Sequence, residues 1–466
     1  MLGKSAEGRT EMTESKEKWG GRNPQDASPG VLPNTVRKEQ SDHSEYPIMR
    51  AVLEYTNISE ALKRVVGNKG APGVDKMTVA ELDPYLKDHW SRIEQELLEG
   101  RYKPAPVRGV EIPKNGGGMR KLGIPTVLDR LIQQALHQVL SPIFEEDFSE
   151  HSFGFRPGRS THQAILQAQR YVTEGKEWVV DIDLEKFFDR VNHDILMSRI
   201  ARKIKDKRVL LVIRRFLQAG LMEGGLTSAR VEGTPQGGPL SPLLSNIMLH
   251  ELDQELKERG HAFCRYADDC NIYVQTERSG QRVMKSIREF LERRLKLKVN
   301  EKKSAVARSG DRKFLAYSII NYKGNPKLAV AMESIKKMKE KIKERTRKGR
   351  GKSIKETVKA LTPLLRGWVN YFKLIEELEI LKKLDRWVRR KLRCIIWRQL
   401  KKPRTREKTM IKQGANPERA KAIAWAGKGP WYSSCTQGMH QAYTNKYFDK
   451  LGLCEMLREK LRMRPL

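Results

Sequence analysis

Cysteine is scarce in this chain of 466 residues, and the few cysteines form no recognisable framework. They lie at positions 264, 270, 394, 435 and 454, which is an odd number at irregular spacing. This pattern matches neither the paired Cys-x-x-Cys of a zinc site nor the cysteine framework of a small secreted domain. We therefore expect a reducing compartment, with Cys264 and Cys270 acting as small apolar residues of strands.

Long apolar runs are also missing. No stretch approaches the roughly 20 apolar residues that a membrane-spanning helix needs. Residues 1–10 are mixed polar and charged, and they lack the apolar centre of a secretory signal. These absences predict an intracellular protein that has no membrane partner.

Acidic residues are few relative to basic ones. The chain has 57 Asp and Glu against 91 Lys and Arg, which gives a formal net charge of +34. Such an excess predicts an extended polyanion, such as nucleic acid, as the partner. The length suffices for two or three domains with a sizeable core.

Two adjacent carboxylates stand out against this positive background. Asp268 and Asp269 lie between the strand-like runs 263–266 and 270–274. Oxygen ligands suit magnesium, and pairs of such ions catalyse phosphoryl displacement in polymerases and nucleases. An earlier strand-like run, residues 178–184, carries Asp181 and Asp183 on one face by its period of two. One of these acids would complete a metal site built from two strands, although acids beside turns are also common as solvated turn formers.

The rest of the chain divides by composition. Residues 1–48 are rich in Gly, Ser, Glu, Lys, Asn and Pro, and we expect a flexible tail. Helical patterns at 93–98 and 135–144 mix with strand-like runs such as 107–112, which predicts an α+β body over residues 49–325. A glycine-rich loop follows the last of these runs, and it carries Lys114 and Arg120. A second loop, residues 233–242, leads into the helical run 243–256, which Ser241 is placed to cap.

Basic residues concentrate after about Met332. Residues 331–410 hold about 27 basic and about 9 acidic side chains on long helical patterns. This mixture suits contacts with a nucleic-acid backbone, and a solvated helical face is the alternative. The interleaved aromatics are expected to pack in the core more than to stack on bases.

Together these motifs resemble one family, the reverse transcriptase and maturase proteins encoded by bacterial group II introns. The matching motifs occur in order over residues 48–466: GAPGVD at 70–75, LGIP at 122–125, SFGFRPGR at 152–159, DLEKFFD at 183–189, PQGGPLSP at 235–242, YADD at 266–269 and GWVNYF at 367–372. The resemblance implies a right-hand polymerase fold. Its fingers and palm would occupy residues 49–325, a helical thumb or maturase domain residues 326–400, and a small basic DNA-binding region residues 401–466.

The resemblance also assigns roles to individual residues. The family's metal-binding acid precedes, by five positions, an aromatic that blocks a ribose 2′-hydroxyl. Asp183 and Phe188 have that spacing, with core packing as the alternative role of Phe188. Asp183, Asp268 and Asp269 would then hold two Mg²⁺ ions for synthesis of DNA on an RNA template. Lys114, Arg120, Phe188 and Gln236 would contact the incoming deoxynucleotide and its templating pair. The expected nucleic-acid contacts are Arg156, Arg159, Lys303, Trp368, Tyr371, Arg389 and Arg390.

The expected partners are the group II intron RNA, a DNA target or primer, and deoxynucleotides, in the bacterial cytoplasm and at the nucleoid when the protein is bound to DNA. Two departures from the family stand out. Ala316 and Tyr317 occupy positions where the family more often has glycine and phenylalanine, so the primer grip is expected to differ in detail. The paired cysteines and histidines of an HNH endonuclease are also missing, so we expect no second-strand cleavage. A mainly RNA-binding maturase and a retron or defence reverse transcriptase are the alternative functions.

Overall fold

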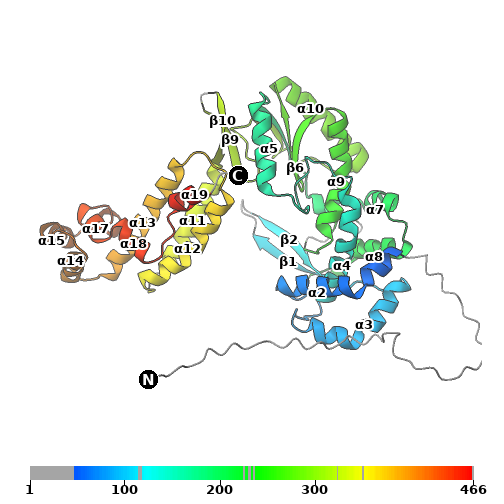
Figure 1. Cartoon of the computed structure of the whole chain (residues 1–466), viewed down its shortest axis with the longest axis horizontal. Coiled ribbons are helices and arrows are strands. Elements are labelled where there is room, and N and C mark those ends of the chain that lie inside the picture. Colours follow the sequence, from blue (N-terminus) through cyan, green and yellow to red (C-terminus); the bar gives the residue numbers. More distant parts are fainter. Residues whose placement is uncertain are drawn as a thin grey trace, which may run out of the picture. The chain divides into compact units, whose positions relative to one another are not determined.

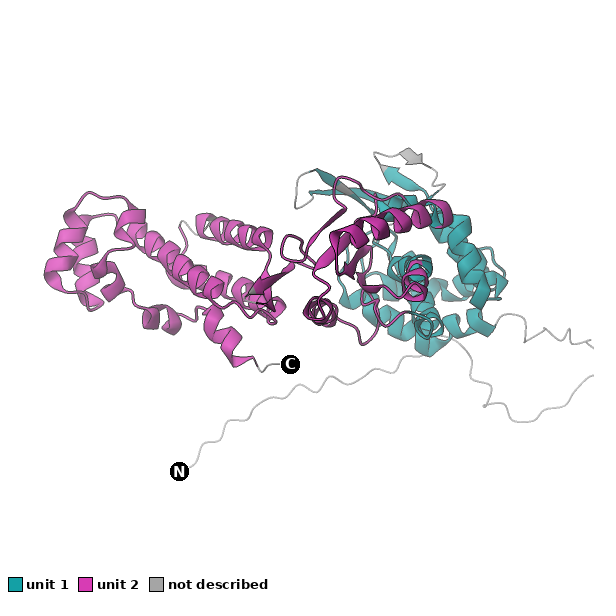
Figure 2. Cartoon of the chain, turned by 90° about the horizontal axis from the view of Figure 1, so that it is seen from above, with its two compact units in different colours: residues 1–148, 186–251, 295–297 teal, residues 149–185, 252–294, 298–466 magenta. Residues whose placement is uncertain are grey.

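The chain folds into two compact units in its computed structural model, which describes residues 47–113, 118–223, 226–228, 232–234, 237–322, 324–348 and 351–463. Unit 1 comprises residues 1–148, 186–251 and 295–297, and unit 2 comprises residues 149–185, 252–294 and 298–466 (Figure 2). Figure 1 labels the helices and strands along the chain. The predicted tail, residues 1–48, lies outside the described residues except for Pro47 and Ile48, which begin helix α1. Within the described ranges, no helix is long and apolar enough to cross a membrane.

Unit 1 combines helices with a small mixed sheet. Its strands follow the order β2-β1-β4-β5. Helix α4 shows how local sequence sets an element, because the Thr126 side chain caps it by accepting a hydrogen bond from the amide of Asp129 at 3.0 Å. The predicted runs 93–98, 107–112 and 135–144 lie in α3, β1 and α4. The elements are α1 (Pro47–Leu53), α2 (Tyr55–Gly67), α3 (Leu82–Leu98), β1 (Val107–Pro113), β2 (Met119–Ile124), α4 (Val127–Glu145), α6 (Phe187–Arg190), α7 (His193–Lys203), α8 (Lys207–Gln218), β4 (Leu221–Glu223) and β5 (Leu226–Ser228).

Helix α9 joins the two units in the sequence. It runs over Ser241–Glu258. We predicted that Ser241 would cap this helix, but the helix already includes Ser241, so that residue lies in its first turn. The difference is one position, which is the usual uncertainty of a helix boundary.

The sheet of unit 2 positions the acidic residues. Its strand order is β6-β7-β3-β8, with β6 at Ala262–Tyr266, β7 at Asp269–Val274, β3 at Trp178–Ile182 and β8 at Ala305–Arg308. Val179 and Tyr273 pair in register and pack in a core with α5 (Thr161–Thr173). On the other face, Val180, Val274 and Val306 lie against Gly280 of α10 (Glu277–Phe290). Both faces are therefore covered, and polar groups gather where the strands end.

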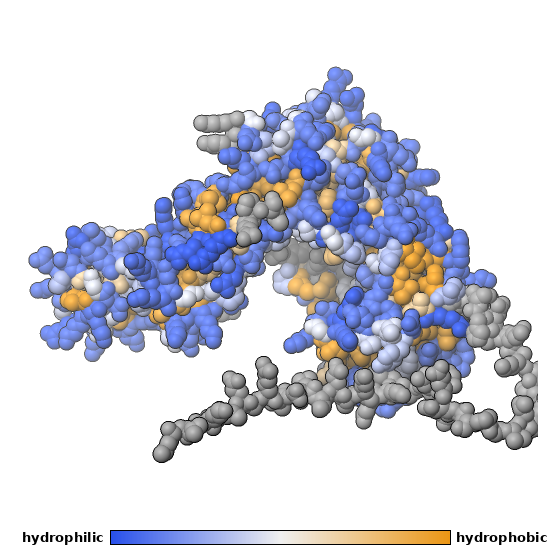
Figure 3. All heavy atoms as spheres, viewed as in Figure 1, coloured by the Kyte–Doolittle hydropathy of each residue, from blue (hydrophilic) through white to orange (hydrophobic). Residues whose placement is uncertain are grey.

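A long helical segment follows the sheet in unit 2. The antiparallel pair β9 (Tyr317–Tyr322) and β10 (Asn325–Val330) leads into it. A continuous buried core runs from α5 and this hairpin into the helices, and it includes Leu361, Leu392 and Trp397. The surface over these helices is largely hydrophilic in Figure 3. The helices are α11 (Met332–Lys348), α12 (Ile354–Tyr371), α13 (Glu379–Gln399), α14 (Pro403–Lys412), α15 (Pro417–Trp425), α16 (Pro430–Ser433), α17 (Gln437–Ala442), α18 (Asn445–Lys450) and α19 (Met456–Arg462).

All five cysteines are free. Cys264 and Cys270 are buried in β6 and β7, which confirms their predicted role as apolar strand residues. Trp397 is 2% exposed, so core packing is also confirmed for this aromatic of the basic helices.

Candidate active site

The acidic tip is a tight hairpin between β6 and β7. Tyr266 pairs with Asp269, so Ala267 and Asp268 form a two-residue turn. Ala267 has φ of +58°, in the left-handed region that the first position of such turns usually reserves for glycine. A strained backbone conformation of this kind persists only where the surrounding structure holds it in place, and such conformations are often found at functional sites.

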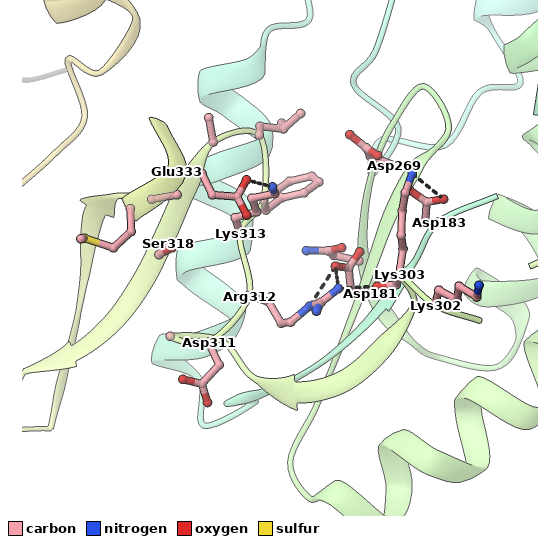
Figure 4. A pocket seen from close by; sticks show the side chains of 17 residues that line it. Asp181, Asp183, Asp269, Lys302, Lys303, Asp311, Arg312, Lys313, Ser318 and Glu333 are labelled. Carbon is pink, nitrogen blue, oxygen red and sulfur yellow. Dashed lines mark hydrogen bonds and ion pairs between the residues drawn. The ribbon is translucent and has the colours of Figure 1, made fainter. Parts of the chain in front are cut away.

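The third carboxylate reaches the same end of the sheet. Strand β3 pairs with β7 so that Asp181 lies opposite Asn271 and Ile182 opposite Cys270. Asp183 comes directly after β3, and Asp269 begins β7. Asp181, Asp183 and Asp269 line one pocket of about 650 Å³ within unit 2 (Figure 4). The predicted common face of Asp181 and Asp183 is thus confirmed, whereas Asp268 itself does not line the pocket.

Asp181 already has a counter-ion inside the protein. Its Oδ2 accepts hydrogen bonds from Nε and Nη2 of Arg312 at 3.0 and 2.5 Å. In the orientation of the Asn271 side chain that satisfies its hydrogen bonds, the amide nitrogen faces Asp181 and donates to Oδ1 at 3.1 Å. Asp181 is therefore held as a structural ion pair.

Asp183 is held mainly by its backbone. Its amide donates to Oγ of Ser304 at 3.0 Å, and its carbonyl accepts from the amide of Asn300 at 2.8 Å. Its carboxylate faces Nζ of Lys303, with 3.2 Å to Oδ2. The Lys303 side chain is 67% exposed. Because such an exposed pair is weak, the Asp183 carboxylate remains accessible to another cation.

Burial and neighbouring carboxylates raise the pKa values of Asp269 and Asp181. Partial burial and the charges of Asp268, Asp181 and Asp183 raise the pKa of Asp269 to about 6, although its side chain opens onto the pocket. Burial also raises the pKa of Asp181 despite its contact with Arg312. Crowded like charges favour a bound cation, and carboxylate oxygens are the donors that Mg²⁺ prefers. Yet no group of three or more His, Cys, Asp or Glu side chains in the described ranges is already arranged to hold a metal ion.

The SFGFRPGR motif lies beside the acidic tip. A methyl group on Gly154 would come within 2.3 Å of the amide nitrogen of Ala267, so only glycine fits there. Arg156 is buried, and its Nη1 donates to the carbonyls of Ser149 and Ser152, so it holds the loop in this conformation. Arg159 is exposed.

Of the residues predicted to contact the deoxynucleotide, the structure describes Arg120 and Phe188, both in unit 1. Lys114 and Gln236 lie outside the described residues, and Arg120 lies on β2. Phe188 is half-buried in α6, with its ring 5.1 Å from that of Phe187. Its carbonyl accepts a hydrogen bond from the amide of Thr234 at 2.6 Å. The structure thus brings Phe188 against the start of the loop that carries Gln236.

The predicted contacts on the helices of unit 2 have partners inside the protein. Trp368 is half-buried against Phe372. Arg389 forms an ion pair with Glu455 at 3.4 Å and is 11% exposed. Arg390 stacks over the ring of Trp431 at 3.6 Å, and Trp431 is 43% exposed.

Tyr371 joins α12 to the segment in which the chain departs from its family. Its hydroxyl donates to the carbonyl of Leu315 at 2.9 Å. The hydroxyl of Tyr317, which the family's phenylalanine lacks, donates to the carbonyl of Tyr371 at 2.5 Å. Ala316 has φ of +70°, which explains the glycine more usual at this position.

Sequence reasoning missed two groups at the site. Arg312 lies far along the chain from Asp181, and no local pattern links them. Arg265 interrupts the apolar strand β6 and is fully buried. A lone charge inside an apolar run was a visible signal, because buried charges need a partner.

Comparisons with known proteins agree with the geometry. Residues 112–319 match the reverse transcriptase (RNA-dependent DNA polymerase) family, and residues 335–414 match the group II intron maturase-specific domain. Protein YkfC of Escherichia coli K12 is 36% identical over 304 residues, which cover 57% of this chain and 80% of YkfC. The group II intron-encoded protein LtrA of Lactococcus lactis is 42% identical over 197 residues, which cover 42% of this chain and 32% of LtrA.

Among solved structures, a chain of a partial Cas6-RT-Cas1–Cas2 complex is similar with a TM-score of 0.35 and 21% identity, over 53% of this chain and 42% of that chain. The match to YkfC extends over most of that protein, whereas the match to LtrA spans about a third of it. The two family matches follow each other in the order of the sequence motifs. The chain therefore belongs to the group II intron-encoded reverse transcriptases and maturases.

Proposed function

We propose that the chain extends a DNA primer on an RNA template with Asp183, Asp268 and Asp269 as its metal-binding carboxylates. The observation that carries this proposal is the register of β3 and β7, which brings Asp183 and Asp269 to one end of the sheet and into one pocket. In this reading the sheet of unit 2 is the palm, β1 and β2 belong to the fingers, and α11–α13 form the thumb.

The protein's own groups bind and position the reactants. Two Mg²⁺ ions held by the three carboxylates would activate the primer 3′-hydroxyl and neutralise the triphosphate. Lys114 and Arg120 contact the triphosphate, and Gln236 contacts the templating pair. Phe188 excludes a ribose 2′-hydroxyl. Lys303, which pairs with Asp183 in this structure, would be available for a nucleic-acid phosphate if a metal ion took its place.

The test is primer extension on an RNA template by an Asp268→Asn variant. The loss of one ligand charge is expected to abolish extension and to leave RNA affinity within about twofold, since phosphate contacts dominate binding. Asp88→Asn, which removes an exposed acid from α3, is the matched control with unchanged extension. Extension by Asp268→Asn at the parent rate contradicts the assignment.

A second function, binding of the group II intron RNA to assist splicing, rests on the basic helices. Residues 335–414 match the maturase-specific domain, and residues 331–410 carry about three basic side chains for each acidic one. We propose that α11–α13 contact the intron RNA and that residues 401–466 contact target DNA at the bacterial nucleoid. An Asp268→Asn variant that still stimulates splicing would separate this function from polymerisation. Loss of both functions in that variant contradicts the separation.

A further inference from the structure

A buried ion pair lies next to the turn that carries Asp268 and Asp269. Arg265 of β6 and Asp253 of α9 are both 0% exposed. Nε of Arg265 donates to Oδ1 of Asp253 at 2.7 Å, and Nη2 donates to Oδ2 at 2.6 Å. Burying two charges carries a desolvation penalty that well-packed apolar residues avoid, so the pair is weak evidence for stability alone. A further hydrogen bond of Arg265 points to another role.

The third nitrogen of this guanidinium reaches the turn itself. Nη1 of Arg265 donates to the carbonyl oxygen of Ala267 at 2.9 Å. That carbonyl belongs to the peptide bond between Ala267 and Asp268. Fixing it fixes the direction in which the chain enters Asp268 and then Asp269. An arginine suits this task because its rigid fork can bind a carboxylate with two nitrogens and a carbonyl with the third.

The other side of the turn is packed by backbone. The amide of Phe153 donates to the carbonyl of Arg265 at 2.8 Å, and the amide of Arg265 donates to the carbonyl of His151 at 2.9 Å. Gly154 then presses on the amide of Ala267. Ala267 is thus held at both its amide and its carbonyl side, in a left-handed conformation that an alanine does not favour.

We propose that Arg265, oriented by Asp253, is a positioning residue that aims the carboxylates of Asp268 and Asp269 and so sets the metal affinity of the site. This inference rests on the proposed polymerase function. Because Arg265 is fully buried, it would act on the site through the Ala267 carbonyl and not by direct contact with substrate or metal. Removing it leaves all three carboxylates present but lets the turn relax.

The test replaces the whole ion pair with apolar residues, in the variant Arg265→Met/Asp253→Leu. Replacing both partners avoids leaving one buried charge unpaired. The parent, this variant and the control Arg199→Met/Glu251→Leu are compared. The control removes a different ion pair, at 2.5 Å between α7 and α9, which does not reach the turn. The measurements are Mn²⁺ affinity by electron paramagnetic resonance, the Mg²⁺ concentration for half-maximal extension, and kcat and KM for the deoxynucleotide.

The positioning role predicts about tenfold weaker Mn²⁺ binding and a similar rise in the Mg²⁺ requirement, with kcat lowered and the deoxynucleotide KM within about twofold. The control variant Arg199→Met/Glu251→Leu is expected to match the parent in Mn²⁺ affinity, Mg²⁺ requirement and deoxynucleotide kinetics. Parent-like Mn²⁺ affinity and kcat in Arg265→Met/Asp253→Leu overturn the inference. A parent that shows no extension overturns the polymerase proposal instead, and the Mn²⁺ measurement still reports on Arg265.

A second variant is needed in case Arg265→Met/Asp253→Leu does not fold, which circular dichroism would show. Arg265→Lys keeps the charge for Asp253, but its single ammonium cannot replace three guanidinium nitrogens. It is expected to keep the parent's spectrum and to show the same loss of Mn²⁺ affinity. If neither variant keeps the parent's spectrum, the pair is required for folding and the positioning role is overturned.

Discussion

Substituting alanine for Gly154 tests how tightly the acidic tip is positioned. The added methyl carbon would lie 2.3 Å from the amide nitrogen of Ala267 and 2.9 Å from the carbonyl carbon of Tyr266, both backbone atoms. Ordinary contact begins near 3.4 Å, so the turn or the loop has to move by about 1 Å. A misplacement of this size lowers a catalytic rate by about 100-fold. The crowding also costs about 1–3 kcal/mol of stability.

The assay is single-turnover primer extension at saturating deoxynucleotide, with RNA–primer affinity measured by fluorescence anisotropy. We expect Gly154→Ala to lose about two orders of magnitude in rate and to keep its affinity within about twofold. Gly429→Ala is the control, because its methyl group would meet no atom within 4 Å. An extension rate for Gly154→Ala within twofold of the parent would refute the reasoning, since the turn would then tolerate the displacement.

Three further predictions concern separate parts of the chain. Asp183→Asn is expected to abolish extension, whereas Asp181→Asn weakens its pair with Arg312 and mainly lowers the melting temperature; equal loss of rate in both contradicts the distinction. Phe188→Ala is expected to raise ribonucleotide incorporation at least tenfold over deoxynucleotide, as measured by competition on one template. Burial raises the pKa of Asp129 from 3.8 to about 6. The protonated carboxyl of Asp129 therefore contributes fully to the free energy of unfolding below pH 3.8. This contribution, about 3 kcal/mol in all, is lost as the pH rises through 6. Urea unfolding of the parent against Asp129→Asn at pH 4.5 and 7 checks this, and a difference independent of pH contradicts it.

Local patterns predicted the elements that carry the site. Strand-like runs located the strands on both sides of Asp268 and Asp269, and the period of two placed Asp181 and Asp183 on one face. These features depend on neighbours in the sequence. The sequence could not show that Arg312 neutralises Asp181, because that pairing is made only when distant segments fold together.

Predicted contacts of charged residues were harder to judge for the same reason. The sequence predicted Arg156 and Arg389 as nucleic-acid contacts, whereas the structure buries Arg156 against backbone carbonyls and pairs Arg389 with Glu455. The sequence also did not predict that each unit is assembled from segments that are separate in the chain. Residues 149–185, 252–294 and 298–466 combine in unit 2 because β3 pairs with both β7 and β8. The predicted boundaries at residues 325 and 400 stay predictions.

The departures at Ala316 and Tyr317 became interpretable only in three dimensions. The Tyr317 hydroxyl bonds the last residue of α12, so this chain ties the β9 segment to the helices more firmly than a phenylalanine would. Ala316 adopts the conformation for which glycine is the usual choice.

The most direct test of the central claim is to locate the metals in a catalytic complex. A crystal of the chain with an RNA template, a dideoxy-terminated primer, the next deoxynucleotide and Mn²⁺ would be measured for anomalous scattering. The account predicts two Mn²⁺ peaks about 3.5–4 Å apart, bound by Asp183, Asp268 and Asp269, and their loss in Asp268→Asn. Peaks bound by other residues, or peaks that persist unchanged in the variant, would contradict it.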